Sequence, residues 1–157
     1  MKQGILISII ALFSTGLTQA AELLTVGAQL PSMTLTTQHD KAYSFDNSVK
    51  RIVMSAEKQS AGMVTELLDN KAASYLKETN TVYLADMHRM PSLITKFVAL
   101  PQLREKTYDI VLGREEADLA AFPREKGCLT LIALKEQRIE SIKFLCTEDE
   151  LKASMNP

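Results

Sequence analysis

The chain has few of the residue types that build redox, metal and nucleic-acid sites. It contains two cysteines, two histidines and no tryptophan in 157 residues, and its formal net charge is -1. A chain so close to neutral has no basic field to attract nucleic acid, and no polybasic stretch points to a membrane surface. The sequence also has no Gly-rich phosphate loop, no pair of metal ligands at helical spacing and no basic–aromatic patch. It therefore gives no support to nucleotide or nucleic-acid binding.

Long apolar runs are equally scarce, and the one present lies at the N-terminus. Residues 4–17 are apolar and follow a positively charged start, but the run is too short to span a bilayer comfortably. Small residues up to Ala20 are typical of a signal-peptidase site, so we predict a signal peptide over residues 1–20. A membrane anchor or a buried N-terminal helix is the alternative. No cysteine near this site indicates a lipoprotein, and the mature domain, residues 21–157, is expected in the periplasm or outside the cell without a membrane span.

The rest of the chain alternates strand patterns with helical patterns. Apolar runs rich in β-branched residues predict strands at residues 33–37, 42–45, 51–55, 81–86, 108–112, 128–134 and 139–146. Helical spacing and capping signals predict helices at residues 59–68, 71–77 and 92–100, from 113 to near 122, and after Thr147. This order predicts an α/β fold in which helices flank a mixed central sheet that begins with a β-hairpin.

The junction between strand 51–55 and the following helix organises the chain. A helix N-terminus offers free N–H groups and positive potential, so many folds carry chemistry there. This junction contains no cysteine or histidine. Its candidate binding residues are Glu57, Lys58, Gln59, Ser60 and Gly62. Ser60 could act as a nucleophile only beside a base, and the sequence places no histidine next to it; the simpler interpretation is a helix cap in a solvated turn.

Three segments resemble the thioredoxin-like superfamily, in particular its exported thiol-disulfide oxidoreductases and its peroxiredoxin-related members. Residues 26–35 (VGAQLPSMTL) resemble the opening of those proteins, and residues 54–63 (MSAEKQSAGM) resemble their active-site turn. Phe122 with Pro123 resembles the cis-proline that faces this turn, although residues 124–127 are inserted before the next strand. Pro91, after Met90, is another candidate for that role. The resemblance implies a thioredoxin-like domain over the mature chain.

The two cysteines of that active-site turn are absent from this sequence. Gln59 and Gly62 stand at their positions, and neither side chain can form a thiolate. Dithiol exchange and peroxide reduction at this junction are therefore excluded. In catalytic relatives the same face holds the substrate polypeptide, so the resemblance implies a binding face over residues 57–62, 87–91 and 122–124, which includes Pro123.

The two cysteines of the chain, Cys128 and Cys146, flank the predicted terminal hairpin. An oxidising compartment favours a disulfide between an even number of cysteines. A three-residue hairpin loop would place them directly opposite each other, whereas a two-residue loop would turn them to opposite faces of the sheet. A disulfide here would be structural. The alternative is a thiol–disulfide oxidoreductase that uses this pair.

Met87, His88 and Met90 form the sharpest local cluster of candidate metal ligands. Thioether and imidazole groups suit Cu(I), so copper is the cofactor of one alternative function. In the simpler interpretation the methionines pack in the core and His88 is a solvated loop residue.

The favoured hypothesis is a periplasmic binding protein on a thioredoxin-like scaffold, with no redox-active cysteine pair and no cofactor. Its expected partner is a protein of the same compartment. A copper-handling protein and a thiol–disulfide oxidoreductase are the two alternatives.

Overall fold

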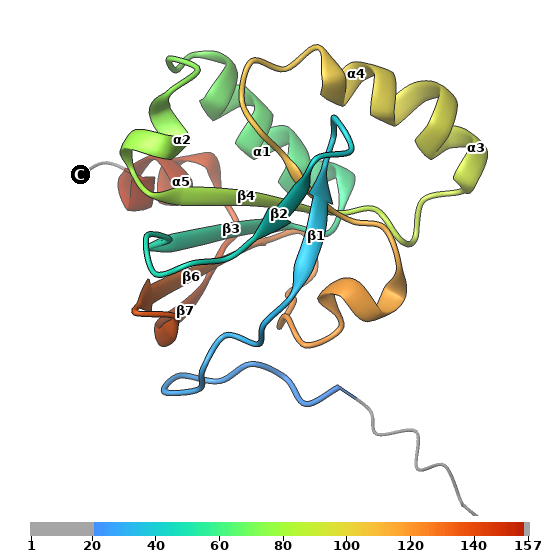
Figure 1. The fold of residues 1–157 in the computed structure, drawn as a ribbon. Coiled ribbons are helices and arrows are strands. Elements are labelled where there is room, and N and C mark those ends of the chain that lie inside the picture. The colour runs from blue at the N-terminus through green and yellow to red at the C-terminus, as the bar shows by residue number, and fades with distance from the viewer. Residues whose placement is uncertain (1–20, 156–157) are drawn as a thin grey trace, which may run out of the picture.

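A seven-stranded mixed sheet organises the computed structural model, which describes residues 21–155. The strands lie in the order β2-β1-β5-β4-β3-β6-β7, and the central three, β5, β4 and β3, run parallel (Figure 1). Antiparallel pairs complete both edges of the sheet. The strands are β1 (Thr34–Thr37), β2 (Ala42–Ser44), β3 (Arg51–Ser55), β4 (Thr81–Asp86), β5 (Val111–Gly113), β6 (Leu129–Lys135) and β7 (Arg138–Leu145).

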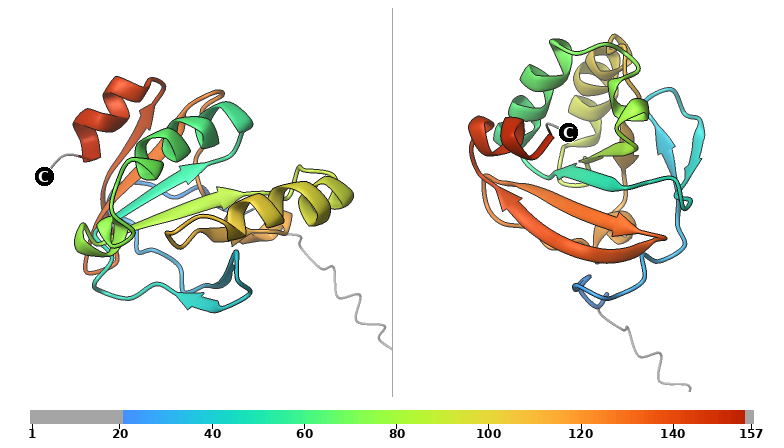
Figure 2. Two further views of the ribbon diagram at one scale, coloured as in Figure 1. Left: turned by 90° about the horizontal axis from the view of Figure 1, so that it is seen from above. Right: turned by 90° about the vertical axis from the view of Figure 1, so that its left-hand side faces the viewer.

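The α-helices cover one face of this sheet (Figure 2). They are α1 (Lys58–Asp69), α2 (Tyr75–Glu78), α3 (Ser92–Ile94), α4 (Leu100–Arg104) and α5 (Glu148–Met155); a π-helical turn (Thr95–Ala99) joins α3 to α4, and a 3-10 helix covers Glu116–Leu119. The predicted mixed α/β architecture with an N-terminal hairpin is confirmed. Within residues 21–155, none of the helices has the length and apolar character needed to cross a bilayer. The predicted signal peptide, residues 1–20, lies outside the described part of the chain.

Two apolar cores lie on the two faces of the sheet, because successive strand residues point in opposite directions. On β3, Val53 packs in the core under α1 and α5, whereas Ile52 and Met54 belong to the core on the other face. The N-terminal segment and the chain after β5 close that second core, through Leu30 and Phe122 among others. Because β3 is buried on both faces, its end is a fixed point for the residues that follow it.

Two segments are less helical than predicted: the one that joins α1 to β4, and the one that follows β5. The helix predicted at residues 71–77 begins only at Tyr75, because α1 ends at a cap in which the side-chain amide of Asn70 donates to a carbonyl one turn back at 2.8 Å. The helix predicted over residues 113–122 is reduced to the 3-10 helix. There, the carboxylate of Asp118 accepts the N–H groups of Arg114 at 2.8 Å and Glu115 at 3.0 Å, which folds the start of the segment into a tight turn.

The helix predicted at residues 92–100 instead continues to Arg104 and passes Pro101. A proline has no N–H to donate and its ring crowds the preceding turn. The π-helical turn relieves this conflict, because the N–H of Leu100 donates to the carbonyl of Thr95, five residues back. The three segments α3, π turn and α4 therefore form one continuous helical rod (Figure 1).

A buried glutamine replaces part of a predicted strand. The strand predicted at residues 108–112 is reduced to β5, which begins at Val111. The side-chain amide of Gln38 is fully buried and bonds the carbonyl of Tyr108 and the N–H of Ile110, each at 2.8 Å. These backbone groups are therefore satisfied by a side chain rather than by a neighbouring strand.

The β6–β7 hairpin has a two-residue turn, residues 136–137, whose φ angles of 48° and 62° are both positive. Such a turn suits the twist of a hairpin, but its register alone would separate the two cysteines. A β-bulge at Glu140 shifts the ladder by one residue, so that Leu129 pairs with Leu145. Cys128 and Cys146, which flank that pair, therefore meet. The expectation that a three-residue loop is needed for this pairing is wrong, because the bulge supplies the extra residue.

Candidate functional site

The candidate site lies where β3 and β4 end and α1 begins. The two strands are paired in parallel, so the residues after both leave the sheet at the same edge. Glu57, Lys58 and Gln59 are exposed at the start of α1, and Gly62 is exposed one turn further on. Of the predicted junction residues, only Ser60 is buried.

Ser60 closes the first turn of α1. Its Oγ accepts the N–H of Glu57 at 3.3 Å and donates to the carbonyl of Glu57 at 3.0 Å. Among the described residues, neither His39 nor His88 forms a hydrogen bond with it. The hydroxyl is thus engaged in capping the turn, and no histidine bonds it to serve as the base that a serine nucleophile needs.

Gly127, rather than Pro123, faces the start of α1. Glu57 Oε2 accepts the N–H of Gly127 at 3.2 Å, and Gln59 Oε1 lies 3.4 Å from the position that a Cβ on Gly127 would occupy. No peptide bond within residues 21–155 is cis, so the cis-proline implied by the resemblance is absent at Pro123. The insertion over residues 124–127 explains the difference, because it carries the chain on from Pro123 and brings Gly127 opposite the helix.

Replacing Gly127 by alanine is expected to lower the free energy of unfolding by about 1–2 kcal/mol. Gly127 has a φ of +77°, and in this left-handed region a Cβ meets the backbone at a cost of about 1–2 kcal/mol. Gly62→Ala is the matched control, because Gly62 is helical with open space around it, and alanine there adds about 0.5–1 kcal/mol. The urea midpoint should therefore fall in Gly127→Ala and rise in Gly62→Ala. A shift of both midpoints in the same direction would contradict this account.

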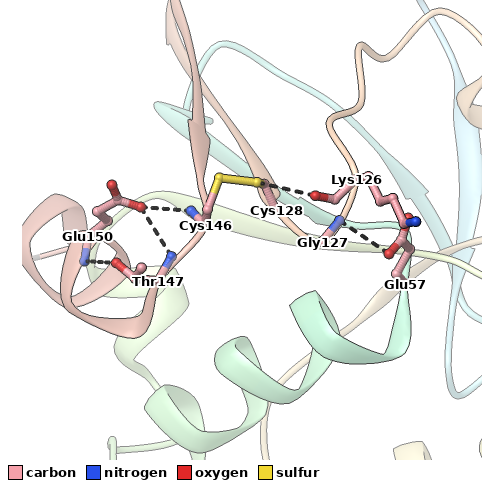
Figure 3. Close-up of a disulfide and its surroundings, with 7 residues drawn as sticks. All are labelled: Glu57, Lys126, Gly127, Cys128, Cys146, Thr147 and Glu150. Carbon is pink, nitrogen blue, oxygen red and sulfur yellow. Dashed lines mark hydrogen bonds between the residues drawn. A yellow bond between two sulfur atoms is a disulfide. The ribbon is translucent and has the colours of Figure 1, made fainter.

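The disulfide between Cys128 and Cys146 is formed, as predicted, and it lies beside this junction (Figure 3). It joins the residue before β6 to the residue after β7, with the two Cα atoms 4.1 Å apart. Cys128 is buried, whereas Cys146 is exposed. Cys146 lines an open hollow of about 570 Å³ with Gln59, Gly62 and Thr147. The disulfide and the start of α1 therefore share one surface.

Helix α5 begins directly after this disulfide and is capped by Glu150 (Figure 3). Glu150 Oε2 accepts the N–H groups of Cys146 at 2.7 Å and Thr147 at 3.1 Å, and Thr147 Oγ1 accepts the N–H of Glu150 at 3.3 Å. The two backbone donors hold the pKa of Glu150 below its ordinary value of 4.5. These reciprocal bonds form a capping box, which confirms the helix predicted after Thr147.

Structural comparison places this arrangement among known folds, whereas no protein-family model and no curated protein matches the sequence. The structure is similar to a peroxiredoxin-like protein from Aquifex aeolicus, with a TM-score of 0.55 and 10% identity over 87% of this chain and 88% of that one. It is also similar to an exposed lipoprotein thioredoxin from Streptococcus pneumoniae, with a TM-score of 0.54 and 14% identity over 80% and 98% of the two chains. The chain has a thioredoxin-like fold. The thioredoxin domain of a thiol-disulfide oxidoreductase from Bacteroides vulgatus matches with a TM-score of 0.51 and 11% identity over 85% and 99%.

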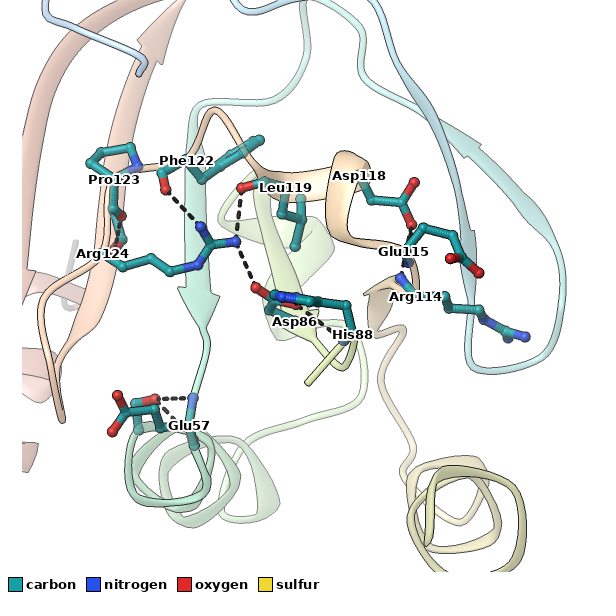
Figure 4. Close-up of polar contacts among 12 residues, drawn as sticks. Glu57, Asp86, His88, Arg114, Glu115, Asp118, Leu119, Phe122, Pro123 and Arg124 are labelled. Atoms are coloured by element: carbon teal, nitrogen blue, oxygen red, sulfur yellow. Dashed lines mark hydrogen bonds and ion pairs between the residues drawn. The ribbon is translucent and has the colours of Figure 1, made fainter. Parts of the chain in front are cut away.

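In this thioredoxin-like fold a buried ion-pair network closes the end of β4 (Figure 4). The two oxygens of Asp86, whose side chain is 3% exposed, contact His88 Nδ1 and an Arg124 nitrogen at 2.6 Å each. Arg124 also donates to the carbonyls of Leu119 at 2.8 Å and Phe122 at 3.3 Å. Burial raises the pKa of Asp86, but the hydrogen bonds from His88 and Arg124 outweigh it, so this pKa lies below the ordinary 3.8. The network ties the chain before β6 to the end of β4.

The three candidate copper ligands are divided between core and surface. Met87 is buried in the core under the helices, Met90 is exposed, and Nδ1 of His88 is bound to Asp86. Copper binding by all three would require Met87 to leave the core. Copper at this loop therefore stays a hypothesis, which a Cu(I) titration of the wild type and of Met90→Leu would test.

Sequence reasoning missed two residues of this surface and the role of a third. Gly127 faces α1, and the carboxylate of Glu125 lies within 4.8 Å of both disulfide sulfurs. Arg124, which the predicted binding face included, holds Asp86. All three lie in the insertion over residues 124–127. The one signal in the sequence was the position of this insertion between Pro123 and the next strand. An insertion at that point must cross the start of α1.

Proposed function

We propose that this chain is an exported binding protein, in which the start of α1 on a thioredoxin-like scaffold recognises a polypeptide in the periplasm. The observation that carries the proposal is the exposed and thiol-free start of α1, beside the open hollow at Cys146. The amide of Gln59 offers both donors and an acceptor, which suit a peptide group. Gly62 has no neighbouring atom within 4 Å of a Cβ position, so a bound chain could approach the helix closely.

Site-specific photo-crosslinking in cells tests this proposal. A photoreactive residue at Lys58 is expected to yield discrete protein adducts, because that side chain is exposed at the start of α1. The same residue at Lys77, exposed on α2 at the other end of the helical layer, is the control and should yield none. The absence of adducts at Lys58, or the same adducts at both positions, would reject the proposal.

A second candidate, thiol–disulfide exchange at Cys128 and Cys146, is favoured by the exposure of Cys146 on that same surface. In the exchange, the thiolate of a partner dithiol attacks Cys146 Sγ, and a mixed disulfide forms as the bond to Cys128 breaks. Cys128 leaves as a thiolate and takes up a proton from water. The second thiol of the partner then displaces Cys146, so the partner is oxidised and this chain is reduced.

Equilibration with glutathione redox buffers separates the two candidates. Exchange predicts that the disulfide is reduced at potentials near those of known catalysts, about -120 to -270 mV, whereas a structural disulfide resists reduction to below about -300 mV. Replacing both cysteines by serine should abolish insulin reduction in the exchange candidate. The same double variant should retain the Lys58 adducts if binding does not require the disulfide.

A further inference from the structure

The helical rod from α3 to α4 carries an apolar ridge on its outer side. The four ridge residues within the rod are spaced i, i+1, i+4 and i+5, so they share one side of the helix. The opposite side packs on the core through Leu100 and Leu103. The exposed fractions are 38% for Met90, which precedes the rod, 69% for Leu93, 47% for Ile94, 66% for Phe97 and 45% for Val98. These five residues form the apolar ridge.

The charged groups next to the apolar ridge in the sequence are cations. The Nζ of Lys96 lies 5.4 Å from the centre of the Phe97 ring, and Arg89 is exposed just before the rod. Neither cation forms an ion pair within residues 21–155. The sequence has no aspartate or glutamate between residues 87 and 104. Nothing acidic on the rod therefore neutralises this rim.

The apolar ridge has too small an area, and its flanking residues carry too much positive charge, to suit binding of a second copy of the chain. Side chains of this size, exposed to this degree, present on the order of 400–500 Å² of apolar surface. A stable protein pair buries about 800 Å² on each partner. A two-fold pairing of the rods would also bring the two Lys96 side chains close together, and like charges facing each other oppose association.

We propose that the apolar ridge docks this protein on the surface of an anionic lipid bilayer. An interfacial helix inserts Phe and Leu side chains among the headgroups while flanking Lys and Arg contact anionic lipids, and Leu93, Phe97 and Lys96 have that arrangement. The rod lies along the outer edge of the molecule (Figures 1 and 2), so a flat surface can reach it. The π-helical turn, a feature frequent at functional sites, includes Phe97 and Val98. This inference does not rest on the proposed polypeptide binding at α1.

Vesicle co-sedimentation of the exported and purified protein tests the inference, with its N-terminus fixed by intact mass. Wild type should bind vesicles of equal phosphatidylcholine and phosphatidylglycerol more tightly than pure phosphatidylcholine. Phe97→Ser should lower the partition coefficient about tenfold, because the side chain that inserts is lost. Val26→Ser is the matched control: Val26 is 62% exposed on the N-terminal segment, and its loss should leave partition unchanged.

The cations provide a second and independent arm. Lys96→Gln should lower partition on the anionic vesicles about fivefold and leave it unchanged on neutral ones, as expected for one cation near a charged surface. Lys143→Gln, at an exposed position on β7, should have no effect. The inference is overturned if wild type stays in the supernatant or if Phe97→Ser binds like wild type. A concentration-dependent dimer that Phe97→Ser abolishes would also overturn it, since a second copy would then cover the ridge.

Discussion

Replacing Asp86 by alanine is expected to lower the free energy of unfolding by about 3 kcal/mol. The change leaves Arg124 and His88 without the anion that both contact at 2.6 Å. The Arg124 side chain is 25% exposed and its Nε already has no hydrogen-bond partner among the described residues. The cost therefore comes mainly from a largely buried cation left uncompensated. Urea unfolding at pH 7, followed by circular dichroism, measures the change.

Asp40 provides a matched control, because it also pairs with two arginines. Its oxygens contact Arg104 at 2.7 Å and Arg114 at 2.6 Å, but its side chain is 55% exposed. Exposed pairs contribute about 0–1 kcal/mol each. Asparagine is the replacement of choice, because the φ of Asp40 is 59° and asparagine tolerates that region. If Asp40→Asn costs as much as Asp86→Ala, burial is not what makes the Asp86 network important.

The Asp86 network should also make stability depend on pH. The pKa of Asp86 is lower in the folded chain than its ordinary value of 3.8. A lowered folded-state pKa means that the stabilisation is present above the unfolded-state pKa and is lost as pH falls through the folded-state pKa. Wild type should therefore lose stability below about pH 4 more steeply than Asp86→Asn, and equal slopes in urea unfolding at stepped pH would contradict the network.

Removing the disulfide is the second change with a large expected effect, about 3 kcal/mol of unfolding free energy. Cys128 and Cys146 are separated by 18 positions, and a crosslink that closes a loop of this size stabilises by about 3 kcal/mol through the unfolded chain. A Cys128→Ala, Cys146→Ala double variant should unfold at lower urea than wild type, with a cooperative transition retained, because both cores stay intact.

A reductant control separates the crosslink from the packing of the two side chains. Dithiothreitol should lower the urea midpoint of wild type towards that of the double variant and leave the double variant unchanged. If the double variant is destabilised but wild type with fully reduced thiols is not, the buried volume of Cys128 rather than the crosslink accounts for the loss.

The elements predicted with the correct bounds were those whose pattern is local. β3 and β4 are continuous apolar runs, and their ends match residues 51–55 and 81–86. The errors occurred where a distant residue competes with the local pattern. The amide of Gln38 takes the hydrogen bonds of the strand predicted at residues 108–112, and Pro101 is passed by a π-helical turn that spacing alone does not predict.

The candidate site followed the same rule. The exposed start of α1 could be located from the strand and helix patterns around Gln59 and Gly62, because those residues are adjacent in sequence. The residue that faces the start of α1, Gly127, could not be located in this way. It belongs to an insertion that is held by the ion pair between Arg124 and Asp86, which are 38 positions apart. Contacts of that separation leave no periodic trace in the sequence.

The bulge at Glu140 determines whether Cys128 and Cys146 lie opposite each other and can form a disulfide. If Glu140 instead entered the ladder, with the turn and the chain length unchanged, Cys128 would face Leu145, and the two thiols would project on opposite sides of the ribbon and stay reduced. Deletion of Glu140 is expected to leave the crosslink in place, because Ala133 would still pair with Ser141 and Leu129 with Leu145.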